Sequence, residues 1–225
     1  GMFRKGKKMF KVKKFVDLSW DLTENTPIYP GDPEPKIEVA TTIENEGYNL
    51  SSVHIGTQTG THVDAPYHFS NEGETIDKME LDFFFGEAVV VRVTDKKAEE
   101  PITMEDIEPY KDKITEGKIV LFNTNWYKKV GTEEFFRHPY VSIEVAEYLV
   151  EKGVRFICID TINADPTGGT EFPVHDLFAA KRLIIGENMA YLDKIDFENV
   201  VVAAFPLKIV GCDGSPVRAV AMEIE

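Results

Sequence analysis

The sequence predicts a mixed α/β protein with more strand than helix. Three observations predict this class. Short runs rich in β-branched residues recur along the 225 residues, three segments carry helix start and stop signals, and 43% of the residues are apolar. This apolar content is sufficient to form a buried core, and the length is typical of one large domain. We therefore expect a single domain over residues 15–225.

The predicted strands are short segments bounded by turn-forming residues. They are Phe15–Ser19, Lys36–Ile43, Asn49–Ile55, Glu87–Thr94, Lys118–Asn123, Val154–Asp160, Arg182–Gly186, Val200–Phe205 and Val217–Ile224. None of these segments approaches the roughly 20 apolar residues that a membrane-spanning helix needs. We therefore expect no membrane span.

The clearest helix is predicted from Ser142 as N-cap to Lys152, because apolar residues recur with helical spacing and Gly153 follows as a stop signal. Thr103–Tyr110 and Pro173–Lys181 show weaker signals of the same kind. These helices alternate with predicted strands, as expected for a mixed α/β fold.

The charge distribution excludes several partners. The chain has 25 basic and 39 acidic residues, a net charge of −14, and seven of the basic residues lie in the acid-free segment 1–14. The acidic remainder would repel phosphate backbones and anionic lipids, so we expect a small-molecule substrate and no nucleic acid or membrane partner. We interpret residues 1–14 as a basic tail, with Gly1 before Met2 typical of a cleaved purification tag.

The cysteines and the N-terminus favour a cytoplasmic location. Cys158 and Cys212 are far apart and have no cysteine neighbours, so we expect both to be reduced and structural. The N-terminus also lacks the apolar segment of a secretory signal.

Three of the five histidines fall within residues 54–68, which makes this segment the most informative of the chain. If the backbone is extended, His62 and Asp64 project from the same face and form half of a metal site. Pro66 fixes a turn that could bring His68 back beside them. The alternative is that these residues are surface polar groups, because the pattern is short. His54 is better interpreted as a hydrogen-bonded structural histidine than as a ligand.

His175 and Glu187 form a second candidate pair. Glu187 directly follows an apolar run, and a buried carboxylate needs a partner, which a metal ion would supply. The alternative is a salt bridge between Glu187 and a lysine or arginine. For His138 the sequence indicates only surface placement. No Gly-x-Ser-x-Gly, Gly-x-Gly-x-x-Gly or Walker pattern occurs, which disfavours a serine hydrolase and a nucleotide cofactor.

Residues 60–69, with the sequence GTHVDAPYHF, resemble the signature of the cyclase-like metal hydrolase family, which includes the bacterial kynurenine formamidases. Other segments along nearly the whole chain also resemble this family: Asp17–Ser19, Tyr29–Asp32, His138–Asp160, Pro173–His175 followed by Glu187, and Gly214–Ala219. The resemblance implies a swivelling β/β/α fold, assembly as dimers or tetramers, and hydrolysis of amide bonds with one or two divalent metal ions, Zn²⁺ or Mn²⁺.

The resemblance also assigns roles to residues. His62, Asp64, His175 and Glu187 would be metal ligands, and His68 would be the acid and base beside them. Where formamidases of the family have a further histidine ligand, this chain has Gln58, whose amide oxygen suits Mn²⁺ or Mg²⁺ better than Zn²⁺.

We therefore expect a metal-dependent hydrolase acting on an amide bond of a small substrate, for which an aromatic or cyclic compound is a candidate. Two alternatives stay open. One is a lactone or cyclic imide hydrolase of the same fold, and the other is a binding protein that holds metal and ligand without catalysis.

Overall fold

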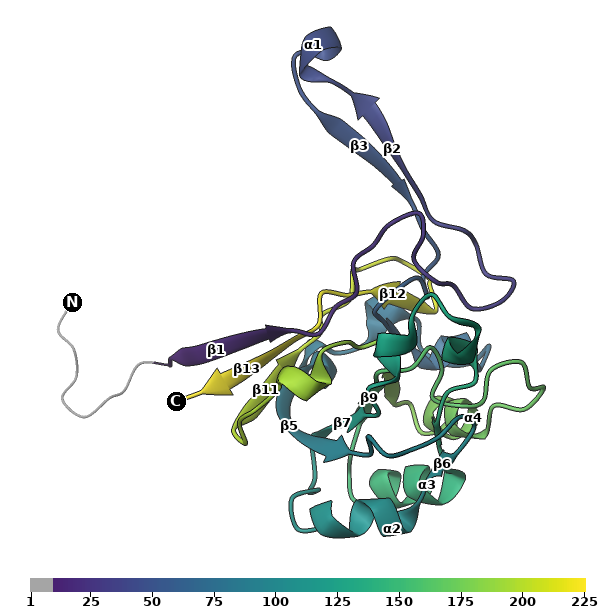
Figure 1. The fold of residues 1–225 in the computed structure, drawn as a ribbon, viewed down its shortest axis with the longest axis vertical. Coiled ribbons are helices and arrows are strands. Elements are labelled where there is room, and N and C mark those ends of the chain that lie inside the picture. Colours follow the sequence, from purple (N-terminus) through teal and green to yellow (C-terminus); the bar gives the residue numbers. More distant parts are fainter. Residues whose placement is uncertain (1–9) are drawn as a thin grey trace, which may run out of the picture.

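The computed structural model describes residues 10–225; most of the predicted basic tail lies outside the described residues. One nine-stranded sheet organises the fold (Figure 1). Its strands, in spatial order, are β1 (Val12–Asp17), β13 (Val220–Ile224), β11 (Val200–Ala203), β5 (Phe85–Arg92), β7 (Ile119–Asn123), β9 (Phe156–Ile159), β10 (Ile184–Glu187), β4 (His62–Asp64) and β12 (Gly214–Pro216). Each of the nine predicted strands overlaps an observed one, which confirms the strand-rich mixed α/β class.

The centre of the sheet is parallel and its two flanks are antiparallel. Strands β5, β7, β9 and β10 pair in parallel, whereas β10 pairs antiparallel with β4 and β4 pairs antiparallel with β12. All residues of β7, β9 and β10 are buried, as expected for parallel strands covered on both faces. Alternate residues of β7 therefore pack into two different hydrophobic cores, one on each face of the sheet. Leu121 lies in one core and Phe122 lies in the other.

Three helices lie on one side of the sheet: α2 (Met104–Ile107), α3 (Ile143–Glu151) and α4 (Pro173–Ala180) (Figure 1). The Ser142 side chain caps α3 by accepting a hydrogen bond from the Val145 N–H, and Gly153 follows with a φ of 85°. The residue ranges of α2, α3 and α4 overlap the three predicted helices and confirm them.

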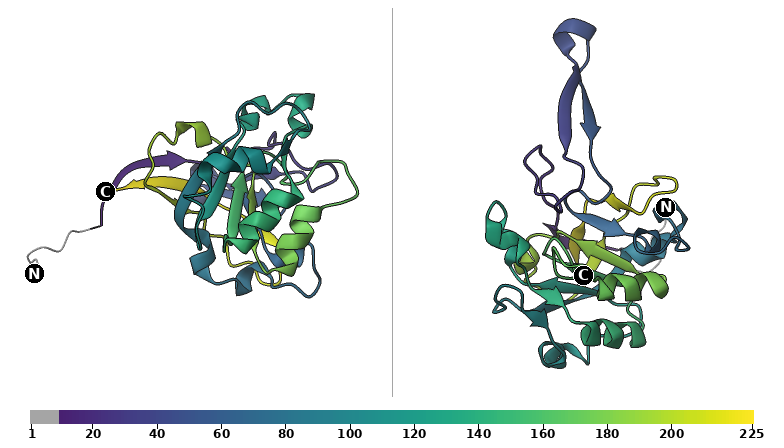
Figure 2. Two further views of the ribbon diagram at one scale, coloured as in Figure 1. Left: turned by 90° about the horizontal axis from the view of Figure 1, so that it is seen from below. Right: turned by 90° about the vertical axis from the view of Figure 1, so that its right-hand side faces the viewer.

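A hairpin projects from the body as an arm (Figures 1 and 2). It consists of β2 (Lys36–Thr41) and β3 (Leu50–His54), joined through the short helix α1 (Ile43–Glu46). Every residue of β3 is exposed, including His54, so the prediction that His54 is a structural histidine is wrong. The histidine lies on the arm, where no core is within reach to hold it.

The remaining elements are short. β6 (Pro101–Ile102) pairs with β8 (Tyr140–Val141), and seven 3₁₀ helices connect the longer elements within residues 10–225. These are Pro66–His68, Ile76–Lys78, Leu81–Phe84, Glu108–Tyr110, Trp126–Lys129, Glu133–Phe136 and Leu192–Lys194. Within the described part of the chain, no helix is long and apolar enough to span a membrane.

The predicted tail is too long at its C-terminal end. β1 begins at Val12, which pairs with Ile224, so residues 12–14 belong to the sheet rather than to the tail. The two lysines of this stretch are exposed on an edge strand, where charged side chains are common because they discourage pairing with another sheet.

Candidate metal centre

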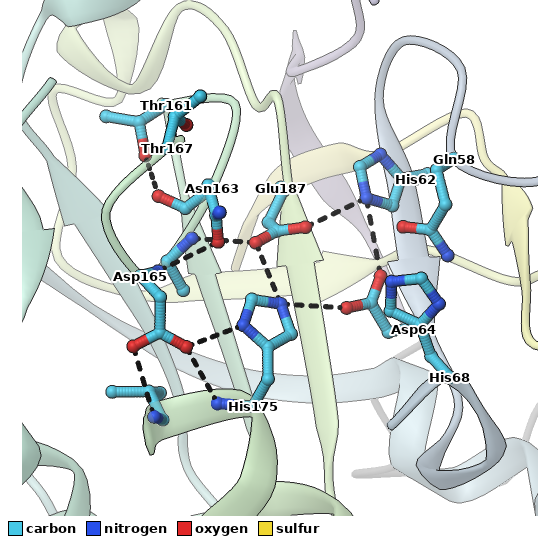
Figure 3. Close-up of polar contacts among 12 residues, drawn as sticks. Gln58, His62, Asp64, His68, Thr161, Asn163, Asp165, Thr167, His175 and Glu187 are labelled. Atoms are coloured by element: carbon cyan, nitrogen blue, oxygen red, sulfur yellow. Dashed lines mark hydrogen bonds and ion pairs between the residues drawn. The ribbon is translucent and has the colours of Figure 1, made fainter. Parts of the chain in front are cut away.

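Two neighbouring strands and one helix bring four predicted ligands together (Figure 3). β4 supplies His62 and Asp64, whose side chains point the same way along an extended strand. β10 supplies Glu187, which lies opposite His62 in the register of the two strands. α4 supplies His175, in the first turn of the helix.

The four side chains converge on a small volume. His62 Nε2 lies 3.3 Å from Asp64 Oδ1 and 3.0 Å from Glu187 Oε1. His175 Nε2 lies 3.1 Å from Asp64 Oδ2 and 3.1 Å from Glu187 Oε2. The exposed fraction of each side chain is only 3 to 5%. The alternative of surface polar groups is therefore wrong for these residues.

Both histidines are oriented through their other ring nitrogen. His62 Nδ1 lies 2.7 Å from the Gly60 carbonyl oxygen, which can only accept a hydrogen bond. His175 Nδ1 lies 2.8 Å from Asp165 Oδ2. These contacts fix the ring orientations, place the protons on Nδ1, and direct each Nε2 toward the two carboxylates. Metal-binding histidines are commonly held in this way.

The residues present fit a divalent cation. Both carboxylate oxygens of Asp64 are buried and have no hydrogen-bond donor in suitable geometry within residues 10–225. The ion pairs of Asp64 and Glu187 in that part of the chain involve only His62 and His175, so the predicted alternative of a lysine or arginine partner for Glu187 is wrong. Two imidazoles and two carboxylates are a donor set suited to Zn²⁺ or Mn²⁺.

Protons on His62 and His175 compete with a cation, because they also balance the negative charges of Asp64 and Glu187. Although burial opposes protonation, the close contacts with the Asp64 and Glu187 carboxylates raise the pKa of His62 to about 10, and interactions with Glu187, Asp165 and Asp64 raise the pKa of His175. A cation that binds here must therefore displace protons from both histidines.

His68 lies beside this cluster on the turn Pro66–His68, as predicted from Pro66 (Figure 3). Its side chain is 29% exposed, and its Nδ1 lies 2.7 Å from Asp213 Oδ2. Although burial opposes protonation, the charge of Asp64 and the hydrogen bond with Asp213 raise the pKa of His68. His68 is thus more accessible than the four buried residues and is not part of their cluster.

Three of the four cluster residues, His62, His175 and Glu187, line a pocket of about 350 Å³ together with His68. The lining residues are Tyr29, Asp32, Pro33, Gly56, Thr57, Gln58, His62, His68, Phe69, Ile162, Asn163, Phe172, His175, Glu187 and Asp213. The pocket therefore combines aromatic walls with titratable groups, as small-molecule sites commonly do.

Gln58 lines the same pocket, but strand periodicity does not explain its position. Gln58 lies in a turn that leads to Gly60, where φ is +66°, so the expected two-residue alternation stops before β4. Its amide Nε2 donates to Asp213 Oδ2 over 3.0 Å, which leaves Oε1 as the atom that could face a cation.

Three features of the site have no counterpart in the predictions. They are the contacts of Asp165 with His175 Nδ1, of Asp213 with His68 Nδ1, and of the Gly60 carbonyl with His62 Nδ1. His138 was predicted at the surface but is 1% exposed, with Nδ1 near the Pro139 carbonyl and Nε2 near Thr167 Oγ1. Nothing in the local sequence indicated which of these side chains turn inward.

A sequence match identifies the family to which the chain belongs. The family described as "Putative cyclase" matches residues 16–166, which include β4 and its flanking turns. The chain belongs to this family. The match confirms the resemblance inferred from residues 60–69.

Similar sequences and solved structures agree with the assignment. The chain is 31% identical to a kynurenine formamidase of Geobacillus thermodenitrificans. The match covers 92% of this chain and 97% of the relative. It is 32% identical to a kynurenine formamidase of Bacillus cereus, and this match covers 95% of this chain and 100% of the relative. Isatin hydrolase A from Labrenzia aggregata, bound to benzyl benzoate, superposes with a TM-score of 0.86 at 25% identity, covering 94% of each chain.

A further similar structure is that of a "predicted metal-dependent hydrolase" from Bacillus stearothermophilus. It superposes with a TM-score of 0.78 at 28% identity, covering 93% of this chain and 98% of that one. Together these structures confirm the cyclase fold that the resemblance implies.

Proposed function

We propose that this cyclase family member is a metal-dependent hydrolase that cleaves an amide bond of a small substrate. The observation that carries the proposal is the buried cluster of His62, Asp64, His175 and Glu187 at the edge of an aromatic pocket. The relatives named kynurenine formamidase and the structural neighbours named isatin hydrolase support hydrolysis of a carbon–nitrogen bond.

In this proposal the four buried side chains hold the cation. A bound divalent cation supplies polarisation of the scissile carbonyl and a lowered pKa of water. His68 accepts a proton from the attacking water and donates one to the leaving nitrogen, so that amine and acid are released. The partial exposure of His68 at the pocket suits this exchange, because a proton carrier must reach both substrate and water.

The pocket favours a small aromatic or cyclic substrate. Tyr29, Phe69 and Phe172 supply aromatic surface against which a flat ring can pack. We propose Zn²⁺ or Mn²⁺ as the metal, at one or two ions per chain, with Gln58 Oε1 as the further ligand for a second ion. A cytoplasmic location is also proposed, supported by the two free cysteines.

Turnover by metal-depleted and metal-restored protein tests the proposal. Elemental analysis of gently purified protein gives the metal and its stoichiometry. The protein is then assayed on formyl-kynurenine, isatin, a lactone and a cyclic imide. We expect hydrolysis of at least one amide, loss of activity with a chelator, and recovery with Zn²⁺ or Mn²⁺. Asp64→Asn should abolish both metal retention and recovery.

The panel also distinguishes the alternatives. Turnover of the lactone alone would indicate an esterase of the same fold and not an amidase. A protein that holds the metal and hydrolyses none of the four compounds would contradict the proposal and favour a binding protein. Activity that survives complete metal removal would also overturn it.

A further inference from the structure

The carboxylate of Asp213 is the meeting point of three side chains next to the metal cluster. Asp213 Oδ2 lies 2.7 Å from His68 Nδ1 and accepts a hydrogen bond from Gln58 Nε2 over 3.0 Å. Asp213 Oδ1 accepts a hydrogen bond from Thr57 Oγ1 over 2.8 Å. The two carboxylate oxygens of Asp213 thus contact three different side chains, and these contacts define the orientation of the carboxylate.

The backbone ties Asp213 to the turn that carries His68. The Ala65 N–H donates to the Asp213 carbonyl over 2.8 Å, and the His68 N–H donates to the Ala65 carbonyl over 3.0 Å. The next residue after Asp213 begins β12, which pairs with β4. The two side chains are therefore held at a fixed separation by hydrogen bonds that do not involve them.

Gly214 makes the contact between Gln58 and Asp213 possible. A Cβ atom at position 214 would lie 2.6 Å from Gln58 Nε2 and 2.6 Å from the Val63 carbonyl oxygen. Real Cβ atoms do not approach other atoms so closely, so only glycine lets the Gln58 amide lie against this part of β12. The packing is thus arranged around the hydrogen bond from Gln58 to Asp213.

We propose that Asp213 is a positioning residue that acts through His68, and that Thr57 and Gln58 hold the Asp213 carboxylate in place. By accepting from Nδ1, Asp213 fixes the ring orientation and the tautomer of His68. It leaves Nε2, which has no hydrogen-bond partner within residues 10–225, as the nitrogen that exchanges a proton with substrate and water. A carboxylate that orients a catalytic imidazole is a recurrent arrangement in hydrolases.

The hydrogen bond to Asp213 gives Gln58 a supporting role that suits its amide group. An amide nitrogen always carries the hydrogens that it donates to a carboxylate, whereas an imidazole donates only through a protonated ring nitrogen. Gln58 thus supports the proton carrier of the site whether or not its oxygen also contacts a metal ion. The catalytic part of the inference rests on the proposed function.

A double-mutant cycle tests whether Asp213 acts through His68. Asp213→Asn, His68→Ala and the double variant are compared in the metal-loaded protein, on the best substrate of the panel. We expect Asp213→Asn to lower kcat about tenfold or more, with KM and metal content unchanged within about twofold. In the His68→Ala background the same substitution should have no further effect, because the group that Asp213 positions is gone.

A spectroscopic readout tests positioning without any assay of activity. In ¹⁵N-labelled metal-loaded protein, the His68 ring signals are assigned by their loss in His68→Ala. We expect the Nδ1-protonated tautomer in the wild type and a shift toward a mixture in Asp213→Asn. Asp32→Asn is the matched control, since it removes another pocket carboxylate that makes no hydrogen bond to His68 within the described residues, and it should leave the tautomer unchanged.

Each possible result is decisive. A protein without turnover on the panel contradicts the proposed function, while the tautomer measurement still tests Asp213. An unchanged tautomer in Asp213→Asn overturns the positioning role, as does an equal loss of kcat in both backgrounds. If Asp213→Asn does not fold, Thr57→Val removes one hydrogen bond to the same carboxylate and is expected to shift the tautomer in the same direction. An unshifted tautomer in that variant would likewise overturn the inference.

Discussion

Asp165 holds His175 and the start of helix α4 with one carboxylate. Asp165 Oδ2 lies 2.8 Å from His175 Nδ1 and accepts a hydrogen bond from the His175 N–H over 3.0 Å. Asp165 Oδ1 accepts from the Val174 N–H over 3.1 Å. The helix start and the candidate ligand are therefore one rigid unit, and the ring cannot rotate without losing the contact to Asp165.

We expect Asp165→Asn to weaken metal binding. The substitution removes the negative charge that orients the imidazole and increases its basicity, and such changes typically lower metal affinity by about 10- to 100-fold. Calorimetric titration with Zn²⁺ measures the effect. Asp176→Asn is the matched control, because Asp176 lies on the same first turn of α4 but is exposed. Equal affinities of Asp165→Asn and the wild type would show that Asp165 only caps the helix.

Metal should stabilise the fold more at high pH than at low pH. The carboxylates raise the pKa of His62 to about 10 and also raise the pKa of His175 and His68. A raised histidine pKa contributes stability that is complete below the unfolded value of about 6.5 and is lost as the pH rises through the folded value. The metal-free protein should therefore lose stability between about pH 6.5 and 10.

Metal binding must release these protons, so its affinity rises over the same pH range. We expect the difference in Tm between metal-loaded and chelated protein to be small at pH 6 and to increase toward pH 9. Thermal unfolding at several pH values measures it. His54→Ala, which changes an exposed histidine of the hairpin, should show the same trend as the wild type. A difference in Tm that is independent of pH would exclude His62 and His175 as the ligands.

His68→Ala should lose activity but keep its metal. A proton carrier contributes typically about 10²- to 10⁴-fold to the rate, so kcat should fall by about that factor. Elemental analysis of the same preparation should give wild-type metal content, because His68 lies outside the buried cluster. Joint loss of metal and activity would make His68 a ligand and would exclude the assigned role.

The sequence predicts what is local and misses what depends on contacts between distant segments. His62 and Asp64 could be paired because two residues of one strand face the same way, and the strand was short but extended as expected. Strand β12, by contrast, has the composition of a turn and exists because Gly214 and Ser215 pair with β4. The contact of Asp213 with His68 follows from that pairing, so no spacing along the chain could indicate it.

The hairpin arm should mediate assembly of the chain with itself. Ile37 and Val53 lie opposite each other across the two strands, on the same face as Val39. The exposed fraction is 36% for Ile37, 56% for Val53 and 74% for Val39. An isolated two-stranded hairpin is marginally stable, and this apolar face has no cover within the described chain. The dimer or tetramer that the family resemblance implies would bury it.

We therefore expect light scattering to show a dimer or tetramer for the wild type and smaller species for Val39→Lys. Ser52→Lys is the matched control, since it adds the same charge to the opposite face of the hairpin. It should retain the wild-type mass. A monomeric wild type, or equal masses for both variants, would show that this face does not join copies of the chain.

Replacing Gln58 by histidine tests whether this position contacts the metal. Gln58 lines the pocket beside His62, and its Oε1 is the atom left after Nε2 has donated to Asp213. If that oxygen faces a second ion, the wild type should hold fewer than two Zn²⁺ per chain or prefer Mn²⁺. Gln58→His should then raise Zn²⁺ occupancy, because imidazole is a softer donor that Zn²⁺ accepts readily.

The same substitution removes the hydrogen bond from the Gln58 amide to Asp213, so metal content and activity need not change together. Higher Zn²⁺ occupancy with lower kcat is the expected outcome, because a gained ligand and a loosened Asp213 act on different properties. Gln58→Ala is the matched control: it removes the amide without adding a donor, and so should lower kcat without raising occupancy. Calorimetric titration of the three proteins with Zn²⁺ separates the cases. Identical stoichiometry and affinity in all three would show that residue 58 does not contact the metal, leaving its hydrogen bond to Asp213 as its function.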